Sequence, residues 1–249
     1  LSRPQREPVW QVMMRFAELC IDAEELTYPM MVAKAAEYLA HHRPLPYRAL
    51  VVDESQDLTA ADWRLIRSLV PEGENDIFLV GDAHQRIYGT PIVLSRCGIH
   101  VRGRSRRLRI NYRSTQVLRR WAFGDFDGLD FDDLDGEGDS HDGYTSLLHG
   151  PHPELVRCHN IDGQLDHAAG HIKQLLDAGV RDHAICGTVP DHRTRTQVIN
   201  GLRERGLSVL PLDKTVRKDG DSGVRIGTMH RVKGLEFHHV VLFDADLDA

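Results

Sequence analysis

The sequence predicts an α/β fold with two parallel-sheet units, because short apolar runs alternate with amphipathic segments in both halves of the chain. In the first half, residues 49–52 and 77–80 have the length and composition of buried strands, and residues 60–70 between them have helical spacing. Residues 9–21 and 28–40 also place apolar side chains at helical spacing, so we expect two packed helices before the first strand. Strands joined by a helix in this way pair in parallel.

The second half repeats the alternation. Residues 184–188, 224–227 and 240–243 have the composition of strands, and residues 193–205 form a helical segment that Gly206 closes. Two α/β units therefore follow one another along the chain.

The segments between the two units are polar. Residues 125–142 are acidic, rich in glycine and without periodicity, which predicts a solvent-exposed loop. The connector before this loop carries a run of arginines: Arg102, Arg104, Arg106, Arg107 and Arg109. Because the net charge of the chain is −6 at pH 7, any attraction to nucleic acid has to come from a local basic patch, and the arginine run is such a patch.

Composition favours a globular protein of the cytoplasm. With 249 residues, 41% hydrophobic and 27% charged, the chain is long enough for one large or two medium domains, and it is not disordered. No apolar run approaches the roughly 18 residues of a membrane span, so we expect no membrane partner. The cysteines stand apart without a C-x-x-C pair, which argues against a zinc ribbon, a redox motif or a disulfide framework.

An acidic pair directly after the first strand is the most informative local feature. Asp53 and Glu54 follow residues 49–52, and the carboxyl ends of strands in open α/β sheets are where phosphates and metal ions bind. Asp53 can hold Mg²⁺, which takes only one or two carboxylates beside nucleotide phosphates. Glu54 can orient and deprotonate an attacking water. Taken alone, the pair is also compatible with an ordinary solvated strand end.

The second strand of the first half ends in a turn that carries an amide, Gln85. An amide can donate to a γ-phosphate and accept from the water that attacks it, so Gln85 is placed to sense hydrolysis.

These motifs together resemble those of UvrD/Rep-type superfamily 1 helicases. Residues 53–57, Asp-Glu-Ser-Gln-Asp, look like motif II, and residues 81–88, Gly-Asp-x-x-Gln-x-Ile-Tyr, look like motif III. Residues 108–114 are similar to motif IV and residues 228–237 to motif V. The resemblance implies two RecA-like (P-loop NTPase) domains with ATP at their interface.

The resemblance also implies domain limits and residue roles. Residues 1–100 would be the C-terminal part of the first RecA-like domain, and residues 101–249 would be the second RecA-like domain, without the large 2B insertion of the family. Tyr112 would stack on adenine, Arg113 would reach the γ-phosphate, and Glu236 would bind the ribose. The positions that would face single-stranded DNA are Tyr88, Thr228 and His230. Each of these side chains, taken alone, also has an ordinary structural explanation.

The sequence departs from the family in three places. Residues 89–92 stand where an Arg-Trp-Arg stretch usually follows motif III, no G-x-x-x-x-G-K-[ST] loop occurs, and no motif VI arginine follows motif V. We therefore expect both RecA-like units to be incomplete and this chain alone to be inactive. The full-length protein is expected to be an ATP-dependent DNA helicase that uses ATP and Mg²⁺ on single-stranded DNA or a single-strand/duplex junction. The alternative is a non-catalytic helicase-like module that binds nucleic acid or protein.

Overall fold

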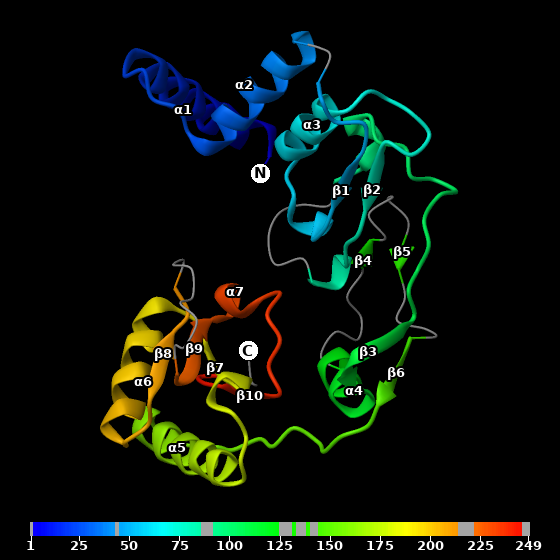
Figure 1. Cartoon of the computed structure of the whole chain (residues 1–249). Coiled ribbons are helices and arrows are strands. Elements are labelled where there is room, and N and C mark those ends of the chain that lie inside the picture. The colour runs from blue at the N-terminus through cyan, green and yellow to red at the C-terminus, as the bar shows by residue number, and fades with distance from the viewer. Residues whose placement is uncertain are drawn as a thin grey trace. The chain divides into compact units, whose positions relative to one another are not determined.

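The chain folds into two compact units, Leu1–Pro153 and Glu154–Ala249. The computed structural model describes residues 2–42, 45–85, 92–124, 131–132, 138–139, 144–213 and 222–245 (Figure 1). Within these ranges, no helix combines the length and the apolar character needed to cross a bilayer.

Two helices begin the first unit, as the sequence predicts. Helix α1 (Arg3–Asp22) starts at a capping box on Ser2, and α2 (Tyr28–His41) starts at Thr27, whose hydroxyl accepts a hydrogen bond from the Met30 backbone N–H. Helix α2 contacts the following helix and buries Val32.

The prediction that both helices pack is wrong for α1. Its apolar side chains are mostly exposed, among them Val12 at 69% and Phe16 at 54%. Apolar spacing predicts that a helix has an apolar face, but it does not identify what covers that face.

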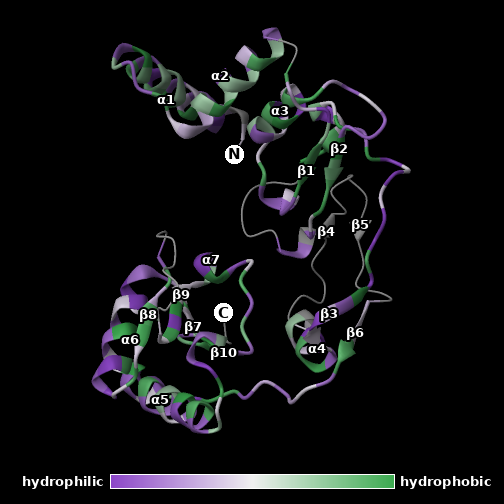
Figure 2. Cartoon of the chain, in the orientation of Figure 1, coloured by the Kyte–Doolittle hydropathy of each residue, from purple (hydrophilic) through white to green (hydrophobic). Residues whose placement is uncertain are grey.

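A parallel pair of strands forms the centre of the first unit. Strand β1 (Leu50–Val52) lies beside β2 (Ile77–Leu79), with Val52 opposite Leu79, and helix α3 (Ala60–Leu69) connects them. Helix α3 begins at a second capping box, in which Thr59 and Asp62 bond reciprocally. Figure 2 shows both strands in hydrophobic colours. The buried core against this sheet consists of Trp63, Leu94, Cys97 and Ile99.

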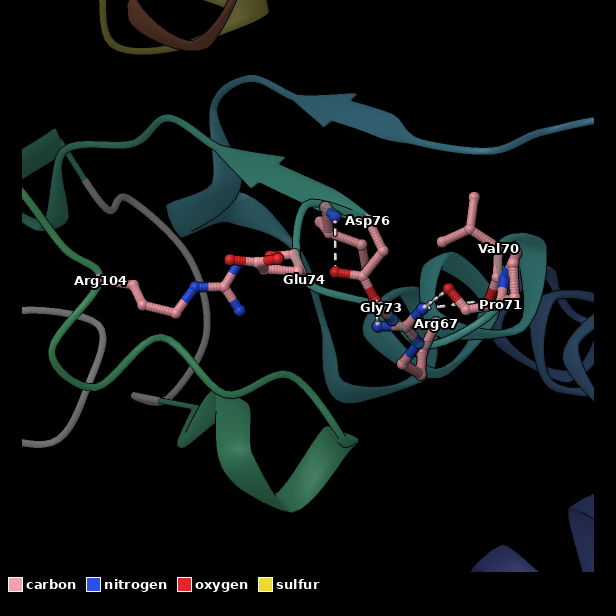
Figure 3. Close-up of polar contacts among 8 residues, drawn as sticks. Arg67, Val70, Pro71, Gly73, Glu74, Asp76 and Arg104 are labelled. Atoms are coloured by element: carbon pink, nitrogen blue, oxygen red, sulfur yellow. Dashed lines mark hydrogen bonds and ion pairs between the residues drawn. The ribbon is translucent and has the colours of Figure 1, made fainter.

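The loop between α3 and β2 is fixed by a charged pair. Arg67 of α3 donates through Nη1 to Asp76 Oδ2 at 2.6 Å and through Nη2 to the carbonyls of Val70 and Pro71, as Figure 3 shows. Asp76 also accepts from the Gly73 backbone N–H at 3.1 Å. Burial alone would raise the pKa of Asp76, but the Arg67 and Gly73 hydrogen bonds outweigh it and hold that pKa below its ordinary value.

The rest of the first unit consists of shorter elements. The described residues of this unit include the 3₁₀ turns η1 (Ser55–Asp57), η2 (Ala83–Gln85) and η3 (Leu94–Cys97), of which η3 contributes Leu94 and Cys97 to the core. Beyond them come β3 (Ile110–Thr115), α4 (Gln116–Gly124), β4 (Phe131–Asp132), β5 (Gly138–Asp139) and β6 (Thr145–Leu148). Strands β3 and β6 pair in parallel, and β4 and β5 pair antiparallel. Most of the segment 125–142, which the sequence predicts to be a loop, lies outside the described residues.

The second unit is built on a four-stranded parallel sheet of order β10-β7-β9-β8. Its elements are α5 (Ile161–Asp177), η4 (Asp182–Ala184), β7 (Ile185–Val189), α6 (His192–Glu204), β8 (Val209–Pro211), β9 (Val224–Thr228), α7 (Met229–Val232) and β10 (His239–Leu242). Strands β7 and β9 are buried along their whole length, and α5 and α6 contribute Ile172 and Leu202 to the core. Gly206 adopts φ +80°, the left-handed conformation expected directly after a helix.

The predicted α/β architecture with parallel sheets is confirmed in both units. Along the chain, the boundary between the two compact units falls between Pro153 and Glu154. The domain boundary that we predict from the motifs lies near residue 100. The structural boundary is defined by contacts within each unit, whereas the predicted boundary is defined by the family's motifs. The predicted domain limits and the predicted incompleteness of each unit therefore remain predictions.

Candidate functional site

The acidic pair of the first motif lies at the carboxyl end of β1. Glu54 adopts φ 51° and ψ 37°, a left-handed conformation that is uncommon for any residue other than glycine. Its backbone N–H donates to Asp53 Oδ1 at 2.8 Å, which supports the turn locally. Non-glycine residues held in this conformation are found mainly where the surrounding structure imposes it, often at functional sites.

Gln56 joins this turn to the end of β2. Its Nε2 donates to Glu54 Oε2 at 2.5 Å, and its Oε1 accepts from the Asp82 backbone N–H at 3.0 Å. The residue is only 4% exposed. The backbone continues the connection, since the Ser55 N–H donates to the Val80 carbonyl. The residue pattern alone assigns no role to Gln56. Its position inside Asp-Glu-Ser-Gln-Asp is the feature of the sequence that could have indicated one.

The turn after β2 is organised around the carboxylate of Asp82. Asp82 Oδ2 accepts from Gln85 Nε2 at 3.0 Å, and Oδ1 accepts from the His84 backbone N–H at 3.0 Å. His84 Nδ1 also lies 3.0 Å from Asp82 Oδ1. Because β1 and β2 are neighbouring parallel strands, Asp53, Glu54 and Gln85 lie at the same edge of the sheet.

Gly81 permits the close approach of these two turns. A Cβ at this position would overlap Ser55 Oγ and would lie 2.9 Å from Gln56 Oε1. Both neighbours are buried, so neither side chain has free space into which to move.

Gly81→Ala is therefore expected to destabilise the first unit by about 1–3 kcal/mol, because the added methyl group overpacks a filled space. Urea unfolding of parent and variant measures the change. Gly73→Ala is the matched control, since a Cβ there meets nothing within 4 Å and the substitution should stay within about 0.5 kcal/mol of the parent. Equal effects of the two substitutions would contradict the assigned role of Gly81.

The segment that resembles motif IV, residues 108–114, places two consecutive side chains at the surface. Tyr112 (68% exposed) and Arg113 are both exposed, although neighbouring residues of a regular strand point to opposite faces. The pairing of β3 with β6 shifts register between Asn111 and Thr115, and Asn111 Oδ1 accepts from the backbone N–H groups of Arg113 and Ser114. This local turn, which sequence reasoning did not anticipate, re-aims both side chains.

The segment that resembles motif V, residues 228–237, begins where β9 ends in the second unit. Thr228 is the last residue of β9 and is buried at 6% exposure, whereas His230 and Glu236 are exposed. Tyr88 lies outside the described residues.

The acidic edge of the first unit carries a side chain that could supply a ligand to a metal ion. Asp53 is exposed and carries a carboxylate, the oxygen ligand that Mg²⁺ prefers. In the part of the chain that the structure describes, no group of three or more His, Cys, Asp or Glu side chains could hold a metal ion by itself.

The arginines of the connector are exposed. Arg102, Arg104, Arg106, Arg107 and Arg109 lie between η3 and β3, and Arg104 Nη2 donates to the Glu74 carbonyl, as Figure 3 shows. The connector is thus attached to the loop that Arg67 and Asp76 fix.

Comparison with protein families identifies the first part of the chain. Residues 5–90 match the model of the UvrD/REP helicase N-terminal domain, which confirms the resemblance for the segment that carries the first two motifs. No curated protein matches the chain. The segments that resemble motifs IV and V lie outside the matched residues.

Proposed function

We propose that this chain, whose residues 5–90 belong to the UvrD/REP helicase N-terminal domain family, carries the ATP-hydrolysing and DNA-contacting elements of an ATP-dependent helicase or translocase. The observation that carries the proposal is the hydrogen-bonded edge of the first unit, where an acidic pair and an amide lie together in the matched segment. This edge offers a carboxylate for a metal ion, a carboxylate for an attacking water and an amide for a phosphate, which are part of what water-mediated phosphoryl transfer uses.

At that edge each side chain has a distinct role. Asp53 would bind the Mg²⁺ that neutralises the phosphate charge of ATP. Glu54 would orient a water molecule and accept its proton. Gln85 would contact the γ-phosphate, so the turn after β2 would lose that contact when the phosphate leaves.

The later motifs would complete the nucleotide site. Tyr112 offers an aromatic face for adenine, and Arg113 offers a fork of donors for charge that develops on the γ-phosphate. Glu236 would accept hydrogen bonds from the ribose hydroxyls. The exposure of all three is compatible with ligand binding.

Contacts with single-stranded DNA would come from Tyr88, Thr228, His230 and the arginine connector. Stacking on Tyr88 would contribute about 1–3 kcal/mol per base. The exposed His230 would meet a phosphate directly, whereas Thr228, at 6% exposure, would offer a phosphate only the small part of its surface that is accessible. Because the connector arginines are exposed in a chain of net charge −6, they would supply a phosphate-binding surface that the overall charge does not.

Replacing Arg102, Arg106 and Arg109 together by glutamine is expected to weaken binding of a single-stranded oligonucleotide by about tenfold or more at low salt. Each lost phosphate contact should also make the slope of log affinity against log salt about 0.7 less steep. Fluorescence anisotropy at several salt concentrations measures both quantities.

The control replaces Arg15, Arg64 and Arg193, which are exposed elsewhere on the chain. Both triple variants take the net charge from −6 to −9, since −6 − 3 = −9. A parental salt slope in the connector variant, or the same weakening in both variants, would show that the connector does not bind phosphates.

The proposed function is tested by DNA-stimulated ATP hydrolysis of the full-length protein. Turnover that single-stranded DNA accelerates supports it. The second candidate is a non-catalytic helicase-like module that binds nucleic acid or protein. DNA binding without ATP turnover in the full-length protein would select that candidate.

A further inference from the structure

We propose that Gln56 is a positioning residue that couples the Glu54 carboxylate to the turn 81–85, so that the water-activating group and the phosphate sensor move as one unit. This inference rests on the proposed function, because it assumes that Glu54 activates water. It adds a residue to which neither the motifs nor the chemistry of the site assigns a role.

Gln56 uses both ends of its amide, and this fixes its orientation. The NH₂ group donates to Glu54 Oε2, and the carbonyl oxygen accepts from the Asp82 backbone N–H. If the amide turned over, an oxygen would face the carboxylate and an NH₂ group would face another donor. Because the side chain is 4% exposed, water cannot readily replace a lost partner.

The same contacts continue to the phosphate sensor. Asp82, whose N–H binds Gln56, accepts from the Gln85 side chain through Oδ2. A hydrogen-bonded path therefore runs from Glu54 through Gln56 and Asp82 to Gln85. A movement of Gln85 that displaces the Asp82 backbone must displace the amide that orients Glu54. The carboxylate is thus fully oriented only when the turn after β2 is in place.

Two substitutions at Gln56 separate the two halves of the coupling. Gln56→Met keeps an unbranched side chain of similar volume but removes both the donor and the acceptor. Gln56→Glu keeps an oxygen for the Asp82 N–H, yet it replaces the neutral NH₂ donor with a second carboxyl group that competes with Glu54 for a proton. Gln164→Met is the control, because Gln164 also accepts from a backbone N–H, that of Asp244, but lies in the second unit.

The first measurement is hydrogen exchange of the Asp82 backbone amide, followed by NMR in this chain without ligand. Gln56→Met should speed exchange by about fivefold or more, as expected for loss of a hydrogen bond, whereas Gln56→Glu should leave it slow. The second measurement is ATP turnover of the full-length protein. Both Gln56 variants should lower kcat by about 10²-fold while changing the KM for ATP less than about threefold, because a misoriented base affects the chemical step. The Gln164 control should keep the parental kcat.

The outcomes distinguish this inference from the proposed function. If Asp82 exchanges at the parental rate in Gln56→Met, the coupling is absent and the inference is overturned, whatever the ATPase result. If exchange changes as expected but the parent protein turns over no ATP, the coupling stands and the proposed function fails. An active parent whose Gln56 variants keep the parental kcat also overturns the inference. A fall in kcat for both Gln56 variants, with the control unchanged, supports it.

Discussion

Glu54→Gln in the full-length protein is expected to reduce ATP turnover by at least about 10²-fold while ATP affinity stays within about tenfold of the parent value. The substitution removes the base but keeps the size of the side chain. It also leaves a carbonyl oxygen that can still accept the hydrogen bond from Gln56 Nε2, so the turn should keep its shape. Single-turnover kinetics and equilibrium binding of a nucleotide measure the two quantities separately.

The chain offers a matched control for this substitution. Glu24 is another glutamate with a positive φ, 55° against 51° at Glu54, so Glu24→Gln makes the same chemical change at a position of similar φ. Turnover of that variant should equal the parent value. If Glu54→Gln instead weakened ATP binding more than about tenfold, Glu54 would be a binding or structural residue.

Much of the fold could be predicted from the sequence because its strands are short, apolar and separated by helical spacing. The predicted strands at 49–52 and 77–80 correspond to β1 and β2, and the helix predicted at 193–205 corresponds to α6 within one residue at each end. The pairing of β3 with β6 was not predictable in this way. Residues 108–113 alternate apolar and polar side chains, which favours a strand but does not identify its partner, and the Asn111 turn interrupts the ladder.

The candidate site was predictable in its residue types but not in its connections. The positions of Asp53, Glu54 and Gln85 at one sheet edge follow from parallel strands, whose carboxyl ends lie together. The coupling through Gln56 depends on the left-handed conformation of Glu54, which no spacing rule indicates. The requirement for Gly81 likewise depends on the contact of two turns that are distant in sequence.

Asp76→Asn is expected to lower the free energy of unfolding of the first unit by about 3 kcal/mol at neutral pH. The Asp76 and Arg67 side chains are only 10% and 17% exposed, so the loss of the carboxylate leaves a largely buried guanidinium without its charged partner. The Gly73 backbone N–H loses a charged acceptor at the same time. Urea unfolding followed by tryptophan fluorescence, to which the buried Trp63 contributes, measures the change.

The dependence of this effect on pH follows from the lowered pKa of Asp76. A carboxyl group whose pKa is lower in the folded than in the unfolded state stabilises the fold above its unfolded pKa, and that contribution is lost as pH falls through the folded value. The difference in stability between parent and Asp76→Asn should therefore be full at neutral pH and shrink below pH 3.8, the ordinary pKa of the group. The exposed pair of Arg15 and Glu18, at 65% and 57% exposure, is the control, and Glu18→Gln should cost less than about 1 kcal/mol. A difference for Asp76→Asn that stayed constant from neutral pH to pH 3 would mean that the Arg67 pair does not stabilise the loop through charge.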